Sequence, residues 1–106
     1  MQADLFQTLA DPVRLRLVEL LLDHEQAVND LVDQVGIHQS GVSRHLRILQ
    51  ESGFVQVRPD GARRLYSLRS ERFSELDDWV SHYRSLWEAR LTRLDAALAR
   101  KETING

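Results

Sequence analysis

The chain has 106 residues, 42% of them hydrophobic, which predicts one small globular domain. It has no cysteine and no run of about 18 apolar residues, which excludes disulfides, thiolate metal sites and a membrane-spanning helix. The net charge of −2 conceals a basic middle third, because residues 1–36 carry −5, residues 37–69 carry +4 and residues 70–106 carry −1. Such a local patch is suited to phosphate attraction, although chance variation in a short window is the alternative. The first residues show no signal-peptide pattern, so a cytoplasmic location is expected.

Four helices are predicted in the first half of the chain. Residues 5–9 form a short apolar stripe, and Asp11 is expected to cap a second, centrally buried helix that begins at Pro12. Residues 23–26 form a polar connector. Asn29 is expected to cap a third helix, which Gly36 ends, and a fourth helix runs over residues 39–52. Two helices joined by a turn with glycine are typical of a helix-turn-helix.

A hairpin and a long helix are predicted next. Residues 54–58 and 62–68 alternate in polarity around a turn at residues 59–61, which indicates a β-hairpin. Apolar residues then recur every three or four positions over residues 73–98, which indicates a single amphipathic helix. We therefore expect a domain over residues 1–100 and a disordered tail over residues 101–106.

The fourth helix has two distinct faces. At about 100° per residue, Val42, Leu46 and Leu49 share an apolar side, and a narrow polar side lies opposite. The polar side holds Gln39, Ser40, Ser43, Arg44 and Arg47. These side chains match a helix that reads a major groove, with arginine on guanine and glutamine on adenine, and with the last arginine on a phosphate. The alternative is an ordinary solvated helix face.

Two further residues of this helix leave both interpretations open. His45 lies between the faces, where it would either bond at the edge of the core or contact DNA. Gly41 would either allow close approach to DNA or reflect the nearby helix start.

The hairpin is basic around its turn, with Arg58, Arg63 and Arg64 close to it. Its place directly after the fourth helix favours a wing that contacts the DNA backbone or a minor groove. The alternative is an edge hairpin that charge protects from aggregation.

Four motifs in this order resemble the ArsR/SmtB family of bacterial winged-helix repressors. They are residues 9–17 (LADPVRLRL), 39–49 (QSGVSRHLRIL), 52–55 (SGFV) and 61–68 (GARRLYSL). The resemblance implies a mainly α winged helix-turn-helix, in the order α-α-α-α-β-β-α, that binds an inverted-repeat operator on double-stranded DNA as a homodimer. It places DNA reading at Gln39, Ser40, Ser43 and Arg44, and the wing contacts at Arg63 and Arg64.

The same resemblance places the homodimer interface on the first and last helices. The expected interface residues are Leu5, Phe6, Leu9, Val80, Tyr83, Trp87, Leu91 and Leu94.

The sequence departs from metal-sensing members because no cysteine pair stands near the third helix. Asp78 and His82, four residues apart, are weak metal candidates, and an i,i+4 hydrogen-bonded pair is the simpler interpretation. We therefore expect neither a metal nor another cofactor.

A DNA-binding repressor with no membrane association is thus the leading hypothesis. The alternatives are a metal-responsive repressor with non-thiol ligands on the last helix, and a winged-helix module that binds proteins. An enzyme is not expected, since the sequence has no nucleophile–base pair, no glycine-rich phosphate loop and no paired carboxylates in a plausible site.

Overall fold

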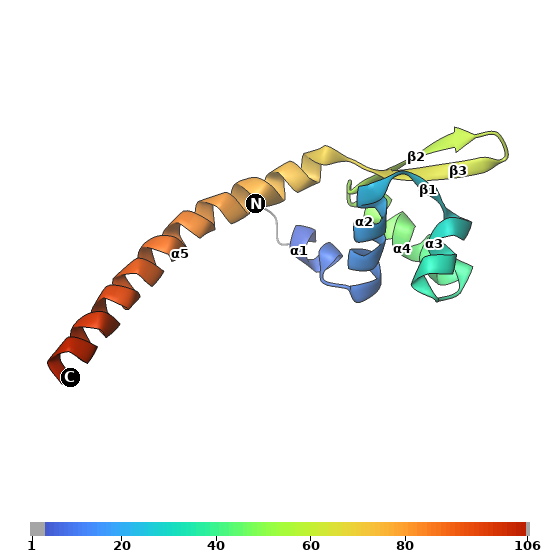
Figure 1. Cartoon of the computed structure of the whole chain (residues 1–106). Coiled ribbons are helices and arrows are strands. Elements are labelled where there is room, and N and C mark those ends of the chain that lie inside the picture. The colour runs from blue at the N-terminus through green and yellow to red at the C-terminus, as the bar shows by residue number, and fades with distance from the viewer. Residues whose placement is uncertain (1–3, 106) are drawn as a thin grey trace. The chain divides into compact units, whose positions relative to one another are not determined.

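The computed structural model describes residues 4–105, with side chains through Lys101. Its helices are α1 (Asp4–Leu9), α2 (Pro12–Asp23), α3 (Val28–Val35), α4 (Gln39–Glu51) and α5 (Ser70–Asn105) (Figure 1). Its strands are β1 (Gln26–Ala27), β2 (Val55–Asp60) and β3 (Arg63–Leu68). The predicted order of helices and hairpin is confirmed, with one additional short strand. The chain divides into two compact units, one up to residue 74 and one from residue 75.

The first unit begins with the predicted cap of α2. The Asp11 side chain accepts hydrogen bonds from the backbone N–H of Val13 at 2.9 Å and of Arg14 at 3.1 Å, and Pro12 follows at the first helical position. The second helix was expected to be centrally buried, and it is buried on one side only, because Leu22 is 69% exposed. One side of the helix supplies the core residues Leu17, Val18, Leu20 and Leu21.

The helix-turn-helix consists of α3 and α4. Gly36 ends α3 in the left-handed region with φ 80°, and its N–H bonds to the carbonyl of Val32 at 3.1 Å. The predicted cap at Asn29 is wrong, because α3 begins at Val28 and its cap position is Ala27 of β1. Asp30 instead reaches back to accept the Ala27 backbone N–H at 3.3 Å.

The core of the first unit lies between the helices and the sheet. Its fully buried apolar side chains are Leu5, Leu17, Leu31, Val42, Leu46, Leu49, Phe54 and Val55. Leu5 was expected at a dimer interface, but it is 0% exposed and has no surface left for a second chain. Phe54 also packs edge-on against the Phe73 ring, with centroids 5.2 Å apart.

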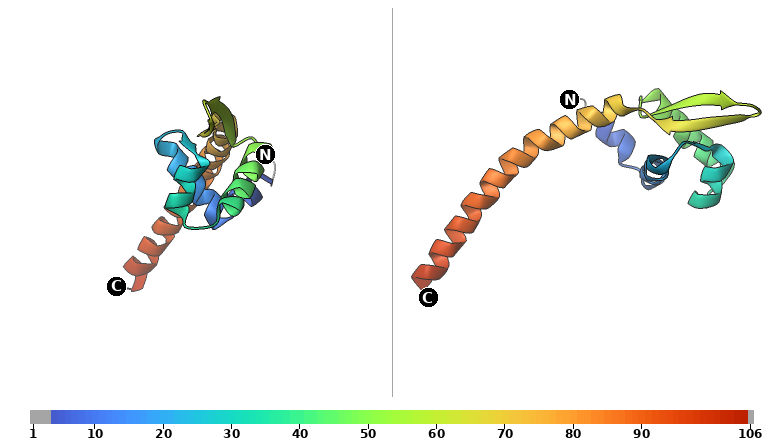
Figure 2. Two further views of the ribbon diagram at one scale, coloured as in Figure 1. Left: turned by 90° about the vertical axis from the view of Figure 1, so that its right-hand side faces the viewer. Right: turned by 45° about the horizontal axis from the view of Figure 1, so that its top comes forward.

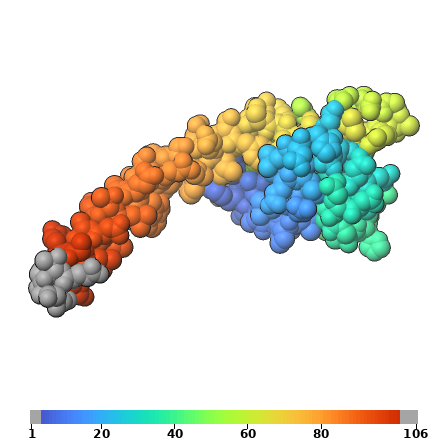
Figure 3. All heavy atoms as spheres, in the orientation of Figure 1, coloured from blue at the N-terminus to red at the C-terminus, as the bar shows by residue number. Residues whose placement is uncertain are grey.

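The sheet has the strand order β1-β3-β2 and is antiparallel throughout. Asp60 pairs with Arg63, so Gly61 and Ala62 alone form the turn, and β2 extends two residues further than predicted. Pro59 is tolerated because β2 is an edge strand. The hairpin of β2 and β3 projects from α3 and α4 in both views of Figure 2, and its tip protrudes in Figure 3.

The second unit consists of α5 from residue 75 onward. The helix continues to Asn105, past the boundary at residue 100 where the sequence predicted a tail. Residues 96–101 include three alanines, a leucine, an arginine and a lysine, which are among the best helix formers. Gly106, the last residue of the expected tail, lies outside the described residues.

Candidate DNA-binding surface

The exposed face of α4 carries the polar residues predicted from the sequence. Gln39, Ser40, Arg44 and Arg47 are exposed and Ser43 is half-buried. Val42, Leu46 and Leu49 on the other side are fully buried, which confirms the predicted core face. The core therefore fixes the rotation of α4 about its axis and with it the direction of the polar face.

His45 belongs to the interior of the first unit. Its side chain is buried, and its Nδ1 lies 3.3 Å from a guanidinium nitrogen of Arg14. Since a guanidinium only donates, Nδ1 is the acceptor in this hydrogen bond. Arg14 also donates to the backbone carbonyl of Thr8 at 2.5 Å. Of the two open interpretations, this geometry favours a structural link between α2 and α4.

Gly41 lies close to the Ile37 side chain. A Cβ built at this position would lie 3.1 Å from the Ile37 side chain, closer than ordinary van der Waals contact. A larger residue here would require the Ile37 side chain to shift by a few tenths of an ångström.

Carboxylate pairing separates the nine arginines of residues 4–74 into two groups. Six form ion pairs: Arg14–Asp11, Arg16–Glu19, Arg58–Glu25, Arg63–Asp30, Arg69–Glu71 and Arg72–Asp4. Arg44, Arg47 and Arg64 have no carboxylate partner within the described part of the chain. These three arginines therefore keep an uncompensated positive charge, and all three belong to α4 or the hairpin.

Two ion pairs hold the hairpin against the segment around β1. Arg63 donates to Asp30 at 2.7 Å from the start of β3, and the Arg58 Nε on β2 donates to Glu25 at 2.9 Å. The hydrogen bond from Arg58 lowers the pKa of the Glu25 carboxyl, and that carboxyl raises the pKa of Arg58. Both pairs are solvent-exposed, so they orient the hairpin more than they stabilise the fold.

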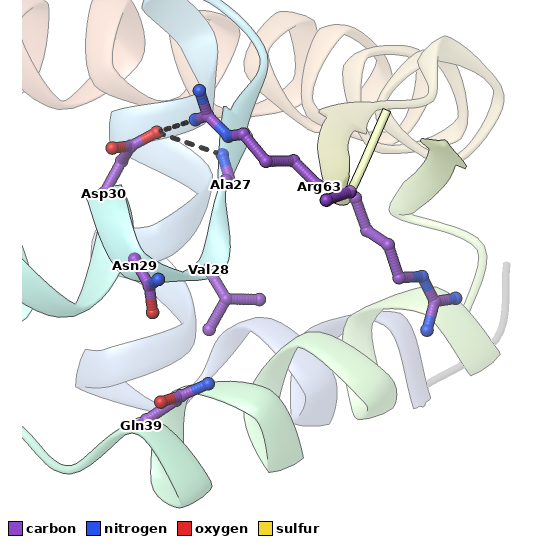
Figure 4. Close-up of a pocket in the computed structure, with 8 residues that line it drawn as sticks. Ala27, Val28, Asn29, Asp30, Gln39 and Arg63 are labelled. Carbon is purple, nitrogen blue, oxygen red and sulfur yellow. Dashed lines mark hydrogen bonds and ion pairs between the residues drawn. The ribbon is translucent and has the colours of Figure 1, made fainter. Parts of the chain in front are cut away.

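Adjoining hollows connect the α4 face with the hairpin. One of about 400 Å³ is lined by residues of α3, α4 and the hairpin, among them Asn29, Gln39 and Arg64. Figure 4 shows Asp30 bonded to Arg63 and Ala27 on one side of this hollow, with Asn29 and Gln39 also lining it. A second hollow of about 390 Å³ is lined by Ser43, Arg47 and Arg64, among others.

Arg64 lines both hollows, so the α4 face and the hairpin form one continuous surface. We call this the α4–wing surface and define it by Gln39, Ser40, Ser43, Arg44, Arg47 and Arg64. Its uncompensated guanidinium groups suit phosphates and guanine edges, and its hydroxyl and amide groups suit either bases or phosphates.

Sequence reasoning missed the acidic partners of the hairpin. Glu25 and Asp30 each stand 33 residues before the arginine that they bind. Their proximity depends on the pairing of Gln26 with Tyr66, in a two-residue strand that the sequence pattern did not reveal. Arg63, predicted as a wing contact with DNA, is ion-paired with Asp30 in the single chain.

The candidate metal ligands do not form a site by themselves. Asp78 and His82 are exposed on α5, where the His82 ring packs edge-on against Tyr83 with centroids 5.4 Å apart. Among the described residues, no three His, Asp or Glu side chains are close enough to hold an ion, and the chain has no cysteine. Two ligands per chain fall short of the three or four that zinc sites take from a protein.

None of the described helices has the length and apolar character that a membrane span requires.

Comparison with known proteins decides the family. Residues 11–57, from the cap of α2 into β2, match the bacterial regulatory proteins of the arsR family. An uncharacterized HTH-type transcriptional regulator of Mycobacterium tuberculosis is 36% identical over 77 residues, which are 72% of this chain and 68% of the relative. The chain belongs to the ArsR family. The resemblance predicted from the four motifs is thereby confirmed.

Solved structures agree with the ArsR assignment over most of the chain. A possible transcriptional regulator for arsenical resistance is similar with a TM-score of 0.70 and 38% identity, over 90% of this chain and 96% of that one. The repressor BigR of Xylella fastidiosa is similar with a TM-score of 0.64 and 33% identity, over 79% of this chain and 84% of that one. This ArsR-family chain is a DNA-binding transcriptional regulator with a winged helix-turn-helix, and the β2–β3 hairpin is its wing.

Proposed function

We propose that the chain is a homodimeric repressor that binds an inverted-repeat operator through the α4–wing surface. The observation that supports this best is the position of the three unpaired arginines, Arg44, Arg47 and Arg64. Every other arginine of residues 4–74 has a carboxylate beside it. Relatives named as repressors, among them a biofilm growth-associated repressor of Xylella fastidiosa, support the direction of regulation. Because such a repressor acts on chromosomal DNA, a cytoplasmic location is part of the proposal.

Within the α4–wing surface, different residues are proposed to contact bases and phosphates. Gln39, Ser40, Ser43 and Arg44 stand in the first turns of α4, where a recognition helix meets base edges. Arg47 is one turn further along, and Arg64 lies on the wing, so both are suited to phosphates. Arg63 is less suited to a phosphate contact because Asp30 already compensates its charge.

The second copy is proposed to pack on apolar side chains that the single chain leaves exposed. Tyr83, Trp87, Leu91 and Leu94 of α5 are each at least 40% exposed. Phe6 and Leu9 of α1 and Val80 of α5 complete the proposed interface, and Leu5 is not part of it. A dimer places two recognition helices about 34 Å apart, in successive major grooves.

A selection experiment tests this proposal. Purified chain is mixed with random genomic fragments, the bound fragments are sequenced, and the strongest site is footprinted. We expect two inverted half-sites about 10 base pairs apart, centre to centre, bound by one dimer. Recovery of no sequence above competitor DNA, or binding by a chain that sediments as a monomer, would overturn the proposal.

A further inference from the structure

Asp30 lies beside the α4–wing surface, where its negative charge opposes DNA. It lines the hollow of about 400 Å³ between α3, α4 and the hairpin, together with Gln39 and Arg64. Of the described residues that line this hollow and the adjoining one of about 390 Å³, Asp30 is the one carboxylate. A negative side chain repels phosphates, so Asp30 reduces the attraction that the arginines of this surface supply.

The Asp30 carboxylate is held in place by two donors from different elements. Its Oδ2 accepts the backbone N–H of Ala27, directly before α3, at 3.3 Å, and the guanidinium of Arg63, the first residue of β3, at 2.7 Å (Figure 4). The same oxygen therefore joins the start of α3 to the wing. Asp30 leaves this position only if both hydrogen bonds are lost.

The ion pair between Asp30 and Arg63 is open to solvent, with the Arg63 side chain 56% exposed and the Asp30 side chain 50% exposed. An exposed ion pair contributes at most about 1 kcal/mol, so a DNA phosphate at this hollow competes with Asp30 for Arg63. The exchange has a second cost, because it leaves Asp30 without its cation and next to the phosphates. Like-charge repulsion therefore favours the arrangement in which Arg63 stays on Asp30.

The neighbouring residue Arg64 shows what Arg63 would supply without Asp30. Both arginines line the hollow of about 400 Å³. Arg64 has no carboxylate partner within the described part of the chain, whereas Arg63 is paired. The wing thus presents two adjacent guanidinium groups at one hollow, and the charge of one of them is compensated.

We propose that Asp30 limits the affinity of the chain for DNA by holding Arg63 away from the phosphates. This proposal rests on the proposed use of the α4–wing surface and adds a residue that acts against binding. Because phosphate contacts carry no sequence information, Asp30 lowers the affinity for the operator and for other DNA alike. A genome offers about 10⁶–10⁹ competing non-specific sites, and each phosphate contact that is withheld weakens retention on them.

A purely structural role for Asp30 predicts a change of the opposite sign. If the ion pair served to orient the wing on DNA, its loss would weaken binding, whereas the loss of a restraint on Arg63 strengthens it. Asp30→Asn separates the two roles, because the amide oxygen still accepts the Ala27 N–H and the charge is removed. Asp30→Ser is a second neutral variant, with a hydroxyl as the acceptor. Circular dichroism and urea unfolding establish that both variants keep the native fold.

DNA binding of these variants is measured by fluorescence anisotropy over a range of salt concentrations, on the selected operator and on an unrelated duplex of the same length. One added phosphate contact steepens the slope of log K against log salt concentration by about 0.9, which amounts to about fivefold in affinity between about 1 M and 0.15 M salt. We therefore expect Asp30→Asn and Asp30→Ser to bind both duplexes about fivefold more tightly for each wing in contact at about 0.15 M salt.

The matched control is Asp33→Asn. Asp33 is exposed on the same helix and lines neither hollow, and its substitution changes the net charge by the same amount. We expect this variant to bind both duplexes with nearly native affinity and slope. A gain as large as that of Asp30→Asn would show that net charge alone is responsible, and would overturn the proposal.

Arg63→Ala identifies the source of the gain. In this background Asp30→Asn has no Arg63 guanidinium to release, so we expect its gain to fall to the level of the Asp33→Asn control. A gain of undiminished size without Arg63 would overturn the proposal. Weaker binding by Asp30→Asn and Asp30→Ser in the otherwise native chain would also overturn it.

The arginine variants separate a failure of this proposal from a failure of the α4–wing surface. If Arg44→Ala and Arg64→Ala weaken binding but the two Asp30 variants do not strengthen it, Asp30 does not limit affinity and the α4–wing surface stands. If neither arginine variant weakens binding, the α4–wing surface itself is wrong and the proposal for Asp30 fails with it.

Discussion

Arg44 and Arg16 are both exposed arginines on helices, but their surroundings differ. Arg16 lies beside Glu19 on α2, at 3.5 Å, whereas Arg44 has no carboxylate partner in the described residues and lines a hollow with Ser40 and His38. We expect Arg44→Ala to weaken operator binding by about 1–3 kcal/mol and to relax the base preference at one position of each half-site. Fluorescence anisotropy on the selected operator and on single-base variants measures both effects. Arg16→Ala is the matched control, and equal losses from the two substitutions would contradict this placement of the reading face.

The neighbours Arg63 and Arg64 differ in the same way. Arg64 has no carboxylate beside it, so a phosphate contact by it releases a counterion, whereas the charge of Arg63 is compensated by Asp30. We expect Arg64→Ala to reduce the slope of log K against log salt concentration by about 0.9, and Arg63→Ala to reduce it by less. Operator titrations at four or more salt concentrations give the slope for each variant and so distinguish the two substitutions. A loss of slope for Arg63→Ala as large as that for Arg64→Ala would show that Arg63 leaves Asp30 on the DNA.

The Asp11 carboxylate, which caps α2, makes the stability of the fold depend on pH. The hydrogen bond from the Arg14 backbone N–H, and a second one from Val13, lower the pKa of Asp11 from its ordinary 3.8. Because the folded pKa lies below the unfolded one, this stabilisation is full above the unfolded value and is lost as the pH falls through the folded value. We expect Asp11→Ala to lower the free energy of unfolding by about 1 kcal/mol at neutral pH.

Asp11→Asn is the matched control, since it keeps a capping oxygen and does not titrate. Urea unfolding at pH 7 and at about pH 3 should show the difference between the native chain and Asp11→Asn shrinking in acid. A difference that does not change with pH would mean that Asp11 acts through its shape alone.

At the scale of elements, the sequence predicted the helices and the hairpin but not β1. Helix caps and turns have local signals, as at Asp11 and Gly36, and apolar spacing reveals the core face of α4. The strand β1 has two residues, and its hydrogen bonds come from β3, about 40 residues away. No local pattern carries that information, so the ion pairs of Glu25 and Asp30 could not be predicted either.

Gln26 of β1 is the most deeply buried polar side chain among the described residues. Its amide donates to the Leu20 carbonyl at 2.8 Å and accepts from Gln34 at 2.6 Å. We expect Gln26→Ala to lower the free energy of unfolding by about 1–3 kcal/mol, because a buried carbonyl is left without its donor. Urea denaturation measures this loss of unfolding free energy, and Gln56→Ala on the exposed face of β2 is the control. Similar midpoints for the two variants would show that β1 contributes little to stability.

At the scale of the whole molecule, the sequence predicted the apolar stripe of α5, and the structure shows how much of it the single chain leaves uncovered. Periodicity identifies which residues share a face, but burial within the chain depends on what else packs there. Leu5 and Leu91 look alike in the sequence, and yet Leu5 is fully buried and Leu91 is 53% exposed. In the proposed homodimer a second copy supplies this cover, so we expect stability to rise with protein concentration.

Introducing a carboxylate into the stripe tests whether dimerisation and DNA binding depend on each other. Leu91→Glu places a charge within the proposed dimer interface, and the desolvation of two such charges should dissociate the dimer. A monomer engages one half-site only, so we expect operator affinity to fall by about 10²–10⁴-fold through loss of avidity. Ala96→Glu adds the same charge on the opposite side of α5, about 180° from Trp87, and should change neither property. Sedimentation velocity, operator titration and circular dichroism are measured on both variants, and a folded Leu91→Glu monomer with native operator affinity would show that this chain reads DNA without a partner.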